Sequence, residues 1–370
     1  MINSGAQIIA IQPVWVQGLV GHAGRDASAA GYVLSAEMAG LAVATVLIAL
    51  FGRRLPWRTT LVTALTVAIL GNLTSVALVD ATQVLSVVRF VTGLGAGTCV
   101  TLGFTALGRT ARPDRNFGLC VATTLLYATV VFKLAPWLLG QAGLAALCLV
   151  FASVGVAVLP LVRYLPASAA EESKTAQPVA KHAGLRPWLG VAAFLTYFTA
   201  QGAFWTYAAL VGTWHGISER AVASHLAAAQ VAGLAGALVP VVLGARLGRR
   251  WPTVVGLALG LVPALVFHGE FTERVYLYAI LMYNFGWCMT HPFLLGIVAA
   301  YGESGRYVTF AVASQKLGLA LGPSLAAMVL ARGSYGDVFA LAAVAFAITL
   351  VLAVPAARPI LRSAVRGESL

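Results

Sequence analysis

Charged residues are scarce in this sequence. Asp, Glu, Lys and Arg make up only 10% of the 370 residues, whereas 60% of the residues are hydrophobic. A soluble domain carries about 25% charged residues, so a chain this poor in charge could not cover a surface exposed to water. The scarcity excludes an ordinary soluble protein and indicates that most of the surface faces lipid.

Motifs for cofactor or metal chemistry are also missing. The four cysteines, at positions 99, 120, 148 and 288, lie singly in apolar runs without paired spacing, so we expect neither a disulfide nor a metal site. No Gly-rich loop ends in Gly-Lys-Ser/Thr, which argues against direct use of ATP. No cluster of His, Asp and Glu suits an intramembrane enzyme, and no basic segment suggests a cleavable signal peptide. We expect no enzyme and no cofactor.

Twelve hydrophobic runs approach or exceed the roughly 20 residues that a membrane-spanning helix needs. They do not alternate with period two, so they predict helices and not a β-barrel. The runs cover residues 5–20, 29–51, 57–78, 82–107, 116–138, 141–162, 188–212, 221–245, 252–269, 275–301, 305–331 and 335–357. A polar stretch at 163–187 separates the first six from the last six. The sequence therefore predicts an all-α membrane protein with six-helix bundles at 1–162 and 188–370, a linker at 163–187 and a short C-terminal tail.

The 24 basic residues are distributed unevenly between the two ends of these helices. Counted from a cytoplasmic N-terminus, seventeen fall on the cytoplasmic side, four fall outside and three lie within helices. The positive-inside rule then places both termini and the linker in the cytoplasm. The same distribution accounts for the net charge of +12, so we expect no nucleic-acid partner. The short loops favour a bacterial inner membrane.

The two halves of the sequence repeat each other. The tripeptide Gly-Arg-Arg closes the second predicted helix at residues 52–54 and closes the eighth at residues 248–250, which is 196 positions later. Two parallel six-helix halves joined by a cytoplasmic loop are the anatomy of one class of transporter. We expect the basic residues of these two loops to latch the cytoplasmic side; they are Arg53, Arg54, Arg249 and Arg250.

Two motifs resemble those of the major facilitator superfamily. The fourth helix reads RFVTGLGAG from Arg89 to Gly97, similar to an Arg-x-x-x-Gly-x-Gly-x-Gly pattern of that family. The loop FGRRLPWR, at residues 51–58, resembles a reduced form of its Gly/Asp/Arg loop motif without the Asp. The resemblance covers nearly the whole chain. It implies pseudo-twofold halves, a monomer, alternating access and a pathway lined by the first and seventh helices. The fifth helix lacks the Gly-Pro-rich signature of the drug antiporters.

Glu37 is the only carboxylate well inside a predicted helix. Glu37 in the second helix and Arg89 in the fourth both lie roughly 10–12 Å below the outer surface at 1.5 Å per residue. Equal depth on neighbouring helices predicts an ion pair. Two interpretations stay open: a proton-coupling site at which Glu37 titrates, or a structural pair that locks two helices.

Two further ionisable residues, a lysine and a histidine, are predicted at or near mid-membrane. Lys316 adjoins Gln315 in the eleventh helix, and His291 adjoins the helix-kinking Pro292 in the tenth. They predict a substrate or proton site, with a polar contact between helices as the alternative. Lys133 lies near the outer end of the fifth helix, where its side chain can extend to the headgroups.

Aromatic residues are concentrated in the seventh helix. We expect Gln201, Trp205 and Tyr207 to contact substrate, together with Trp15 of the first helix and the cation Arg89. Packing between helices is the alternative for the aromatic residues. Three intramembrane cations against one carboxylate favour an anionic solute, and aromatic walls suit one that is also amphipathic.

These residues predict a secondary transporter, coupled to protons, that moves a small amphipathic organic solute, with an anion favoured. Gly322 and Pro323 in the eleventh helix are the predicted hinge for alternating access. The alternative within transport is a proton-antiport efflux pump for hydrophobic or drug-like compounds. An intramembrane enzyme and a sensor without flux are further alternatives.

Overall fold

The computed structural model describes residues 1–52, 54–79, 81–107, 113–165, 184–243, 248–301 and 306–357, apart from the side chains of 113–115, 117, 118, 243, 306 and 309. Arg53, most of the predicted linker at 163–187 and the tail after residue 357 lie outside the described residues.

The described part of the chain is built from helices, α1 to α12, with two short irregular helical segments. The helices are α1 (Ile2–Gln17), α2 (Ala27–Phe51), α3 (Trp57–Ala77), α4 (Thr82–Leu107), α5 (Pro113–Ala142), α6 (Leu144–Val158), α7 (Leu185–Trp214), α8 (Glu219–Leu243), α9 (Arg250–His268), α10 (Glu273–Ala299), α11 (Arg306–Leu330) and α12 (Tyr335–Ala356). A π-helical segment, Gly18–His22, follows α1, and a 3-10 segment, Leu159–Tyr164, follows α6. The prediction of an all-α fold with twelve long helices is confirmed.

Most helix ends lie within a few residues of the predicted ones, and the exceptions have local causes. The helix α5 continues through Pro136 to Ala142, because a proline inside a long helix removes one hydrogen bond without ending the helix. The helix α6 gives way to the 3-10 segment at Leu159, immediately before Pro160. At the other end of the linker, α7 begins at Leu185, three residues earlier than predicted.

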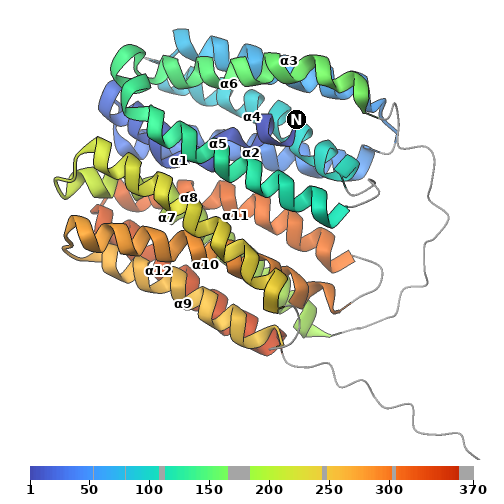
Figure 1. Cartoon of the computed structure of the whole chain (residues 1–370), viewed down its shortest axis with the longest axis vertical. Helices are drawn as coiled ribbons and strands as arrows, with labels where there is room; N and C mark the ends of the chain where they lie inside the picture. Colours follow the sequence, from blue (N-terminus) through green and yellow to red (C-terminus); the bar gives the residue numbers. More distant parts are fainter. Residues whose placement is uncertain are drawn as a thin grey trace, which may run out of the picture.

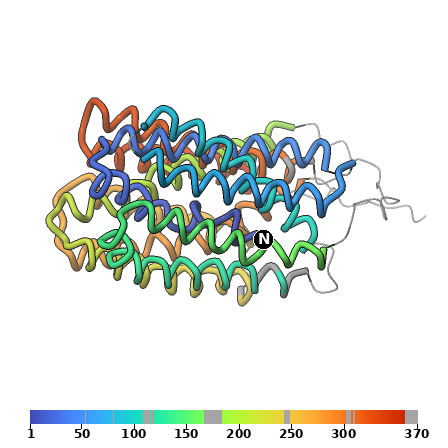
Figure 2. The backbone as a smooth tube through the Cα atoms, turned by 90° about the horizontal axis from the view of Figure 1, so that it is seen from above, coloured from blue at the N-terminus to red at the C-terminus, as the bar shows by residue number. Residues whose placement is uncertain are grey.

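The helices pack in two groups that follow the order of the chain. Figure 1 shows the blue-to-green helices of the first half above the yellow-to-red helices of the second half. Figure 2, seen after a turn of 90°, shows that the axes of the helices are roughly aligned with one another. Within the first half α4 packs on α1, α2 and α3, and within the second half α7 packs on α11 and α12. Contacts between the halves join α2 to α11, α5 to α8 and α1 to α7.

Glycines allow the closest helix contacts in both halves. A Cβ atom built at Gly40 of α2 would lie 2.0 Å from the carbonyl oxygen of Phe90 on α4. The same crossing recurs in the second half, where a Cβ atom at Gly236 of α8 would lie 2.2 Å from the carbonyl oxygen of Phe285 on α10. Backbones at this distance leave no room for a side chain. The equivalent crossings support the predicted internal symmetry.

Hydrogen bonds between the halves are found at the end of the bundle opposite to the linker. Ser28 Oγ donates to the carbonyl oxygen of Ala327 at 2.9 Å, and Tyr207 OH donates to the carbonyl oxygen of Ala27 at 3.1 Å. Lys133 Nζ donates to Ser224 Oγ at 3.3 Å. These contacts bring the two halves together at what we call the outer contact, formed by the ends of α2, α5, α7, α8 and α11 that lie away from the linker, which the predicted orientation places outside.

Candidate functional site

A buried ion pair joins α2 to α4. Arg89 Nε and Nη2 both donate to Glu37 Oε2, at 2.8 and 2.5 Å. Arg89 Nη1 donates to Asn72 Oδ1 at 2.8 Å and to Ser75 Oγ at 3.4 Å, so α3 contributes to the same network. Glu37 is 2% exposed and Arg89 is fully buried. The predicted ion pair is therefore present.

The two oxygen atoms of the Glu37 carboxylate differ in the hydrogen bonds that they accept. Both charge-assisted hydrogen bonds from Arg89 go to Oε2, and Oε1 accepts no hydrogen bond in the described part of the chain. Arg89, in contrast, uses its Nε, Nη1 and Nη2 within the network. In this conformation Glu37 can accept a proton at Oε1, while Arg89 is committed to protein partners and not to a solute.

Trp15 belongs to this network and not to an aromatic wall shared with α7. The Arg89 guanidinium carbon lies 5.3 Å from the centroid of the Trp15 ring, within the range of a cation–π contact. Trp15 is fully buried and its Nε1 has no hydrogen-bond partner. Its ring packs on the ion pair, and a contact between Trp15 and substrate stays a prediction.

A small cavity lies between the halves, next to this network. It is lined by residues of α1, α7, α10 and α11, namely Ile9, Gln12, Gln201, Trp205, Tyr283, Trp287 and Leu319. Two of the predicted substrate contacts, Gln201 and Trp205, are therefore at the cavity. Gln12, Tyr283 and Trp287 were not predicted as site residues.

The lining helices are also those that are too short or not apolar enough to count as membrane spans by themselves. Eight of the described helices are long and apolar enough to cross a membrane by length and composition alone. The four that are not are α1, α7, α10 and α11, which are the four helices that line the cavity. Helices with polar and aromatic residues are tolerated at membrane depth where they face protein or a cavity. The polar and aromatic residues of α7, α10 and α11 are the sequence signal that could have identified Tyr283 and Trp287, whereas α1 is excluded by its length of 16 residues.

Aromatic rings form a stack on the α7–α10 side of the cavity. Tyr283 stacks on Phe204 with 3.8 Å between ring centroids, and on Trp205 with 5.9 Å. The Tyr283 hydroxyl donates to Gln201 Oε1 in a very short hydrogen bond. The hydrogen bond and the two stacking partners fix the Tyr283 ring, so this wall of the cavity is preorganised.

Two polar atoms of cavity residues have no hydrogen-bond partner within the described part of the chain. Gln12 Oε1 is an unused acceptor from the first half, and Trp205 Nε1 is an unused donor from the second half. Gln12 and Trp205 are only 1% and 3% exposed, and a buried polar atom without a partner costs about 1–3 kcal/mol. A solute with one donor and one acceptor could satisfy both atoms and would then contact both halves.

Lys316 and His291 lie one helical turn from the cavity towards the linker end. Lys316 is three residues before Leu319 on α11, and His291 is four residues after Trp287 on α10. The two residues lie on helices that contact each other, α10 and α11, and a shared substrate or proton site stays a prediction. The His291 ring packs edge-on against Phe194 and Phe198. Lys316 is half-buried and has no ion-pair partner among the described residues.

Three other predicted residues lie at the surface or at the outer contact. Tyr207 donates its hydroxyl to Ala27 at the outer contact, away from the cavity lining. Arg54 is exposed after α2. Arg250 is also exposed, and its guanidinium carbon lies 6.0 Å from the Trp251 ring.

Arg249 and the Gly322–Pro323 pair make close contacts within the second half. A Cβ atom built at Gly296 of α10 would lie 3.0 Å from Arg249 Nε. A Cβ atom at Gly322 would lie 2.5 Å from the Thr199 carbonyl oxygen on α7, and one at Gly202 would lie 3.0 Å from Pro323 Cδ. Gly322 and Pro323 are thus at a tight α7–α11 crossing, and their gating role stays a prediction.

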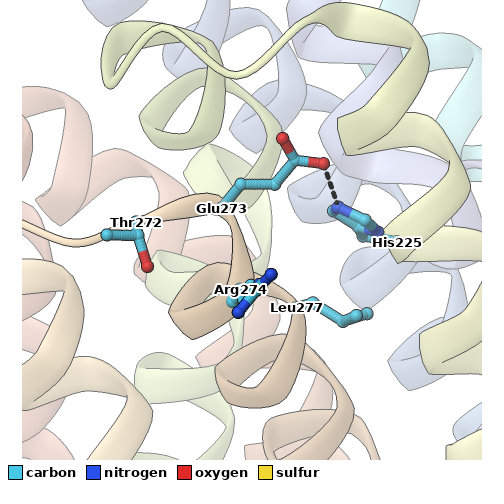
Figure 3. Close-up of a pocket in the computed structure, with 5 residues that line it drawn as sticks. All are labelled: His225, Thr272, Glu273, Arg274 and Leu277. Carbon is cyan, nitrogen blue, oxygen red and sulfur yellow. Dashed lines mark hydrogen bonds and ion pairs between the residues drawn. The ribbon is translucent and has the colours of Figure 1, made fainter.

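A second, shallow pocket opens at the outer ends of α8 and α10. It is lined by His225, Thr272, Glu273, Arg274 and Leu277. Figure 3 shows Glu273 of α10 and His225 of α8 pointing toward each other, and Glu273 Oε1 lies 3.1 Å from His225 Nε2. Glu273 is 55% exposed, so this pair is a surface contact. The pocket shares no lining residue with the central cavity.

Comparison with protein families gives one match that covers most of the chain. The profile described as Major Facilitator Superfamily matches residues 2–302. A search of curated proteins finds no sequence that matches the chain.

Solved structures of transporters are similar over nearly the full length. The partially occluded, inward-open xylose transporter XylE from E. coli is 14% identical, with a TM-score of 0.72 over 95% of this chain and 96% of that one. A D-xylose-proton symporter is 16% identical, with a TM-score of 0.71 over 94% and 95%. An auto-inhibited peptide transporter of the POT family is 12% identical, with a TM-score of 0.78 over 99% and 97%. At these identities the likeness shows the fold alone.

Proposed function

Since the chain belongs to the Major Facilitator Superfamily and is a secondary transporter, we propose that it moves a small amphipathic organic anion together with protons. The observation that carries this proposal is the buried pair of Glu37 and Arg89, in which Glu37 Oε1 is left without a hydrogen bond. A conformation that buries a carboxylate inside the membrane has a different free energy when the carboxylate is charged and when it is protonated. Proton binding at Glu37 can therefore bias alternating access.

The similar structures support coupling to protons without deciding it. One of them is of a D-xylose-proton symporter, and its helices superpose on most of this chain. The pair in this chain joins α2 to α4, inside the first half, so protonation would loosen a contact between those two helices and α3. We further propose that the protein lies in a bacterial inner membrane with both termini and the linker on the cytoplasmic side, an orientation that the positive-inside rule supports.

The central cavity supports a solute with a planar or aromatic part. Trp205, Tyr283 and Trp287 offer ring surfaces, and Gln12 Oε1 and Trp205 Nε1 offer one acceptor and one donor. An aromatic ring that bears a hydroxyl group would stack on these rings and donate to Gln12. The cavity has a volume of only about 10 Å³ in this conformation, so its walls must move apart during the transport cycle to admit such a solute.

The preference for an anion rests on Lys316. Of the three intramembrane lysine and arginine side chains, Arg89 is paired with Glu37 and Lys133 is exposed at the outer contact. Lys316 is the one that lies close to the cavity without an ion-pair partner in the described part of the chain. A half-buried ammonium group one turn from the aromatic wall would attract the carboxylate of a hydroxylated aromatic acid.

The experiment is transport by the purified protein in proteoliposomes, with 3,4-dihydroxybenzoate as the probe. Its hydroxyl groups slow passive permeation, and liposomes without protein give the background. We expect an inward proton gradient to drive accumulation by the wild type. Glu37→Gln should lose at least about tenfold of this accumulation but retain exchange of internal for external solute. Glu273→Gln, which removes an exposed carboxylate, is the matched control and should behave as the wild type.

Two results would contradict the proposal. Equal loss of accumulation and exchange in Glu37→Gln, with a normal elution profile, would make the ion pair structural. Movement of a lipophilic cation in exchange for protons, with no uptake of organic anions, would make the protein an efflux antiporter. Lys316→Gln tests the preference for an anion separately from the coupling to protons. It should weaken binding of the anion, and the transport that remains should still be coupled to protons.

A further inference from the structure

The helix α1 contains a break at the level of the central cavity. Ile11 has φ −118° and ψ 22°, which is not helical, and Pro13 follows two residues later. Pro13 has no N–H group, so the carbonyl oxygen of Ile9 lacks its usual helical donor. The break divides α1 into a segment that ends near Ile9 and a segment that begins near Gln12. The cavity is lined by one residue from each.

The outer segment of α1 also touches the ion pair. Gln12 Nε2 donates to Met38 Sδ at 3.6 Å, and Met38 is the neighbour of Glu37 on α2. Trp15 lies one turn beyond Gln12, at about 4.5 Å further along the axis, and its ring covers the Arg89 guanidinium. One rigid turn of helix therefore carries both a cavity group and the residue that packs on Arg89.

We propose that Trp15 is a positioning residue that links the occupancy of the central cavity to the contact between Glu37 and Arg89. A solute that bonds to Gln12 would pull on the outer segment of α1, and the break at Ile11 would let that segment turn. Trp15 then shifts relative to the Arg89 guanidinium, and this shift changes the strength of the hydrogen bonds that Arg89 donates to Glu37 Oε2. The inference rests on the proposed function, because it needs both a solute in the cavity and a proton at Glu37.

The alternative is that Trp15 only fills space between α1 and α4. The positioning role and the packing role predict different effects when Trp15 is replaced by a side chain without an aromatic ring. Leu replaces most of the apolar volume of Trp but cannot make a cation–π contact, whereas Phe keeps an aromatic face. A residue that only packs would affect folding and all transport modes together. A residue that positions Arg89 would affect the coupling to protons and leave solute exchange in place.

The test uses the full-length protein in proteoliposomes with 3,4-dihydroxybenzoate, and internal pyranine to follow protons. Proton-driven accumulation and solute exchange are measured for Trp15→Leu, Trp15→Phe, Glu37→Gln and the double variant Trp15→Leu/Glu37→Gln. Trp137→Leu is the matched control, since Trp137 is 62% exposed on α5. We expect Trp15→Leu to reduce the ratio of accumulation to exchange about tenfold, in line with a desolvated cation–π contact. Trp15→Phe should lie between Trp15→Leu and the wild type, and Trp137→Leu should match the wild type.

The double variant shows whether Trp15 acts on proton coupling through the ion pair of Glu37 and Arg89. If Trp15 acts through the ion pair, Trp15→Leu causes no further loss in the Glu37→Gln background, because neighbours in one network are not additive. Losses that multiply in the double variant would overturn the inference, as would an unchanged ratio in both Trp15 variants. An equal loss of accumulation and exchange in Glu37→Gln alone would instead overturn the proposed function. The two failures are therefore distinguishable.

Discussion

Asn284 Oδ1 lies 3.3 Å from the point where a side chain at Gly233 would begin. These residues occupy on α10 and α8 the places that Arg89 and Glu37 occupy on α4 and α2, 195 and 196 positions earlier in the sequence. The pseudosymmetric crossing therefore carries an ion pair in the first half and a lone amide in the second. Asn284 is fully buried, and neither Nδ2 nor Oδ1 has a hydrogen-bond partner. At this crossing the carboxylate that can take up a proton belongs to the first half, and the equivalent position in the second half is Gly233.

This asymmetry predicts opposite effects of two similar substitutions. Asn284→Leu replaces an unsatisfied buried amide by an apolar side chain with the same branching, so it should leave the protein as stable as the wild type or more stable. Arg89→Leu strands the carboxylate of Glu37 and should cost about 3–5 kcal/mol of stability. Thermal unfolding in detergent, followed by the size-exclusion profile, measures both. A lower Tm for Asn284→Leu would show that its amide has a partner in the membrane.

The glycines of α4 give a second prediction on packing. A Cβ atom at Gly93 would lie 2.1 Å from the Glu37 carbonyl oxygen, so Gly93→Ala forces α2 and α4 apart and disturbs the ion pair. We expect a loss of proton-driven transport and a lower Tm. Gly140→Ala is the control, because nothing lies within 4 Å of its built Cβ atom. Equal behaviour of the two variants in unfolding measurements would rule out the tight crossing.

The unpartnered atoms of the cavity predict variants that lose affinity without losing stability. Trp205→Phe removes the Nε1 donor and Gln12→Leu removes the Oε1 acceptor, and neither atom is bonded in the protein. Each variant should raise the KM for 3,4-dihydroxybenzoate by about 5–30-fold, since each loses one hydrogen bond of about 1–2 kcal/mol to the solute. The Tm should not fall by more than a few degrees. Unchanged KM values in uptake assays would place the solute elsewhere.

The outer contact predicts a cross-link that stops the transport cycle. Ser28 and Ala327 are joined by a hydrogen bond between the halves, and opening the outer end must separate them. Ser28→Cys/Ala327→Cys, in a background without the four natural cysteines, should react with a short thiol-specific cross-linker and lose transport. Each single variant should remain active after the same treatment. Full transport by the cross-linked protein would mean that the outer contact stays closed throughout the cycle.

Much of the fold follows from the sequence because lipid leaves few choices. Runs of about 20 apolar residues must become helices, so the bounds of α3 and α4 were predicted to within one residue. The pairing of Glu37 with Arg89 also followed, because equal depth and opposite charge are both visible in the sequence.

The sites of Trp15 and Tyr207 could not be predicted in the same way. Depth along a helix follows from residue counting, but the direction in which a side chain points depends on how the helix is rotated in the bundle. Gln12 and Trp15 lie on the same helix, yet Gln12 lines the cavity and Trp15 does not. The break at Ile11 has no signal in the sequence other than Pro13.

The most direct test of the account measures solute and proton movement together in wild-type proteoliposomes. An imposed inward proton gradient is applied, uptake of 3,4-dihydroxybenzoate is followed with labelled solute, and internal pyranine reports protons. We predict accumulation of the anion with proton entry, and no accumulation when the gradient is collapsed by an ionophore. Accumulation that persists without the gradient, or proton movement opposite to that of the solute, would contradict the central claim that Glu37 couples anion transport to protons.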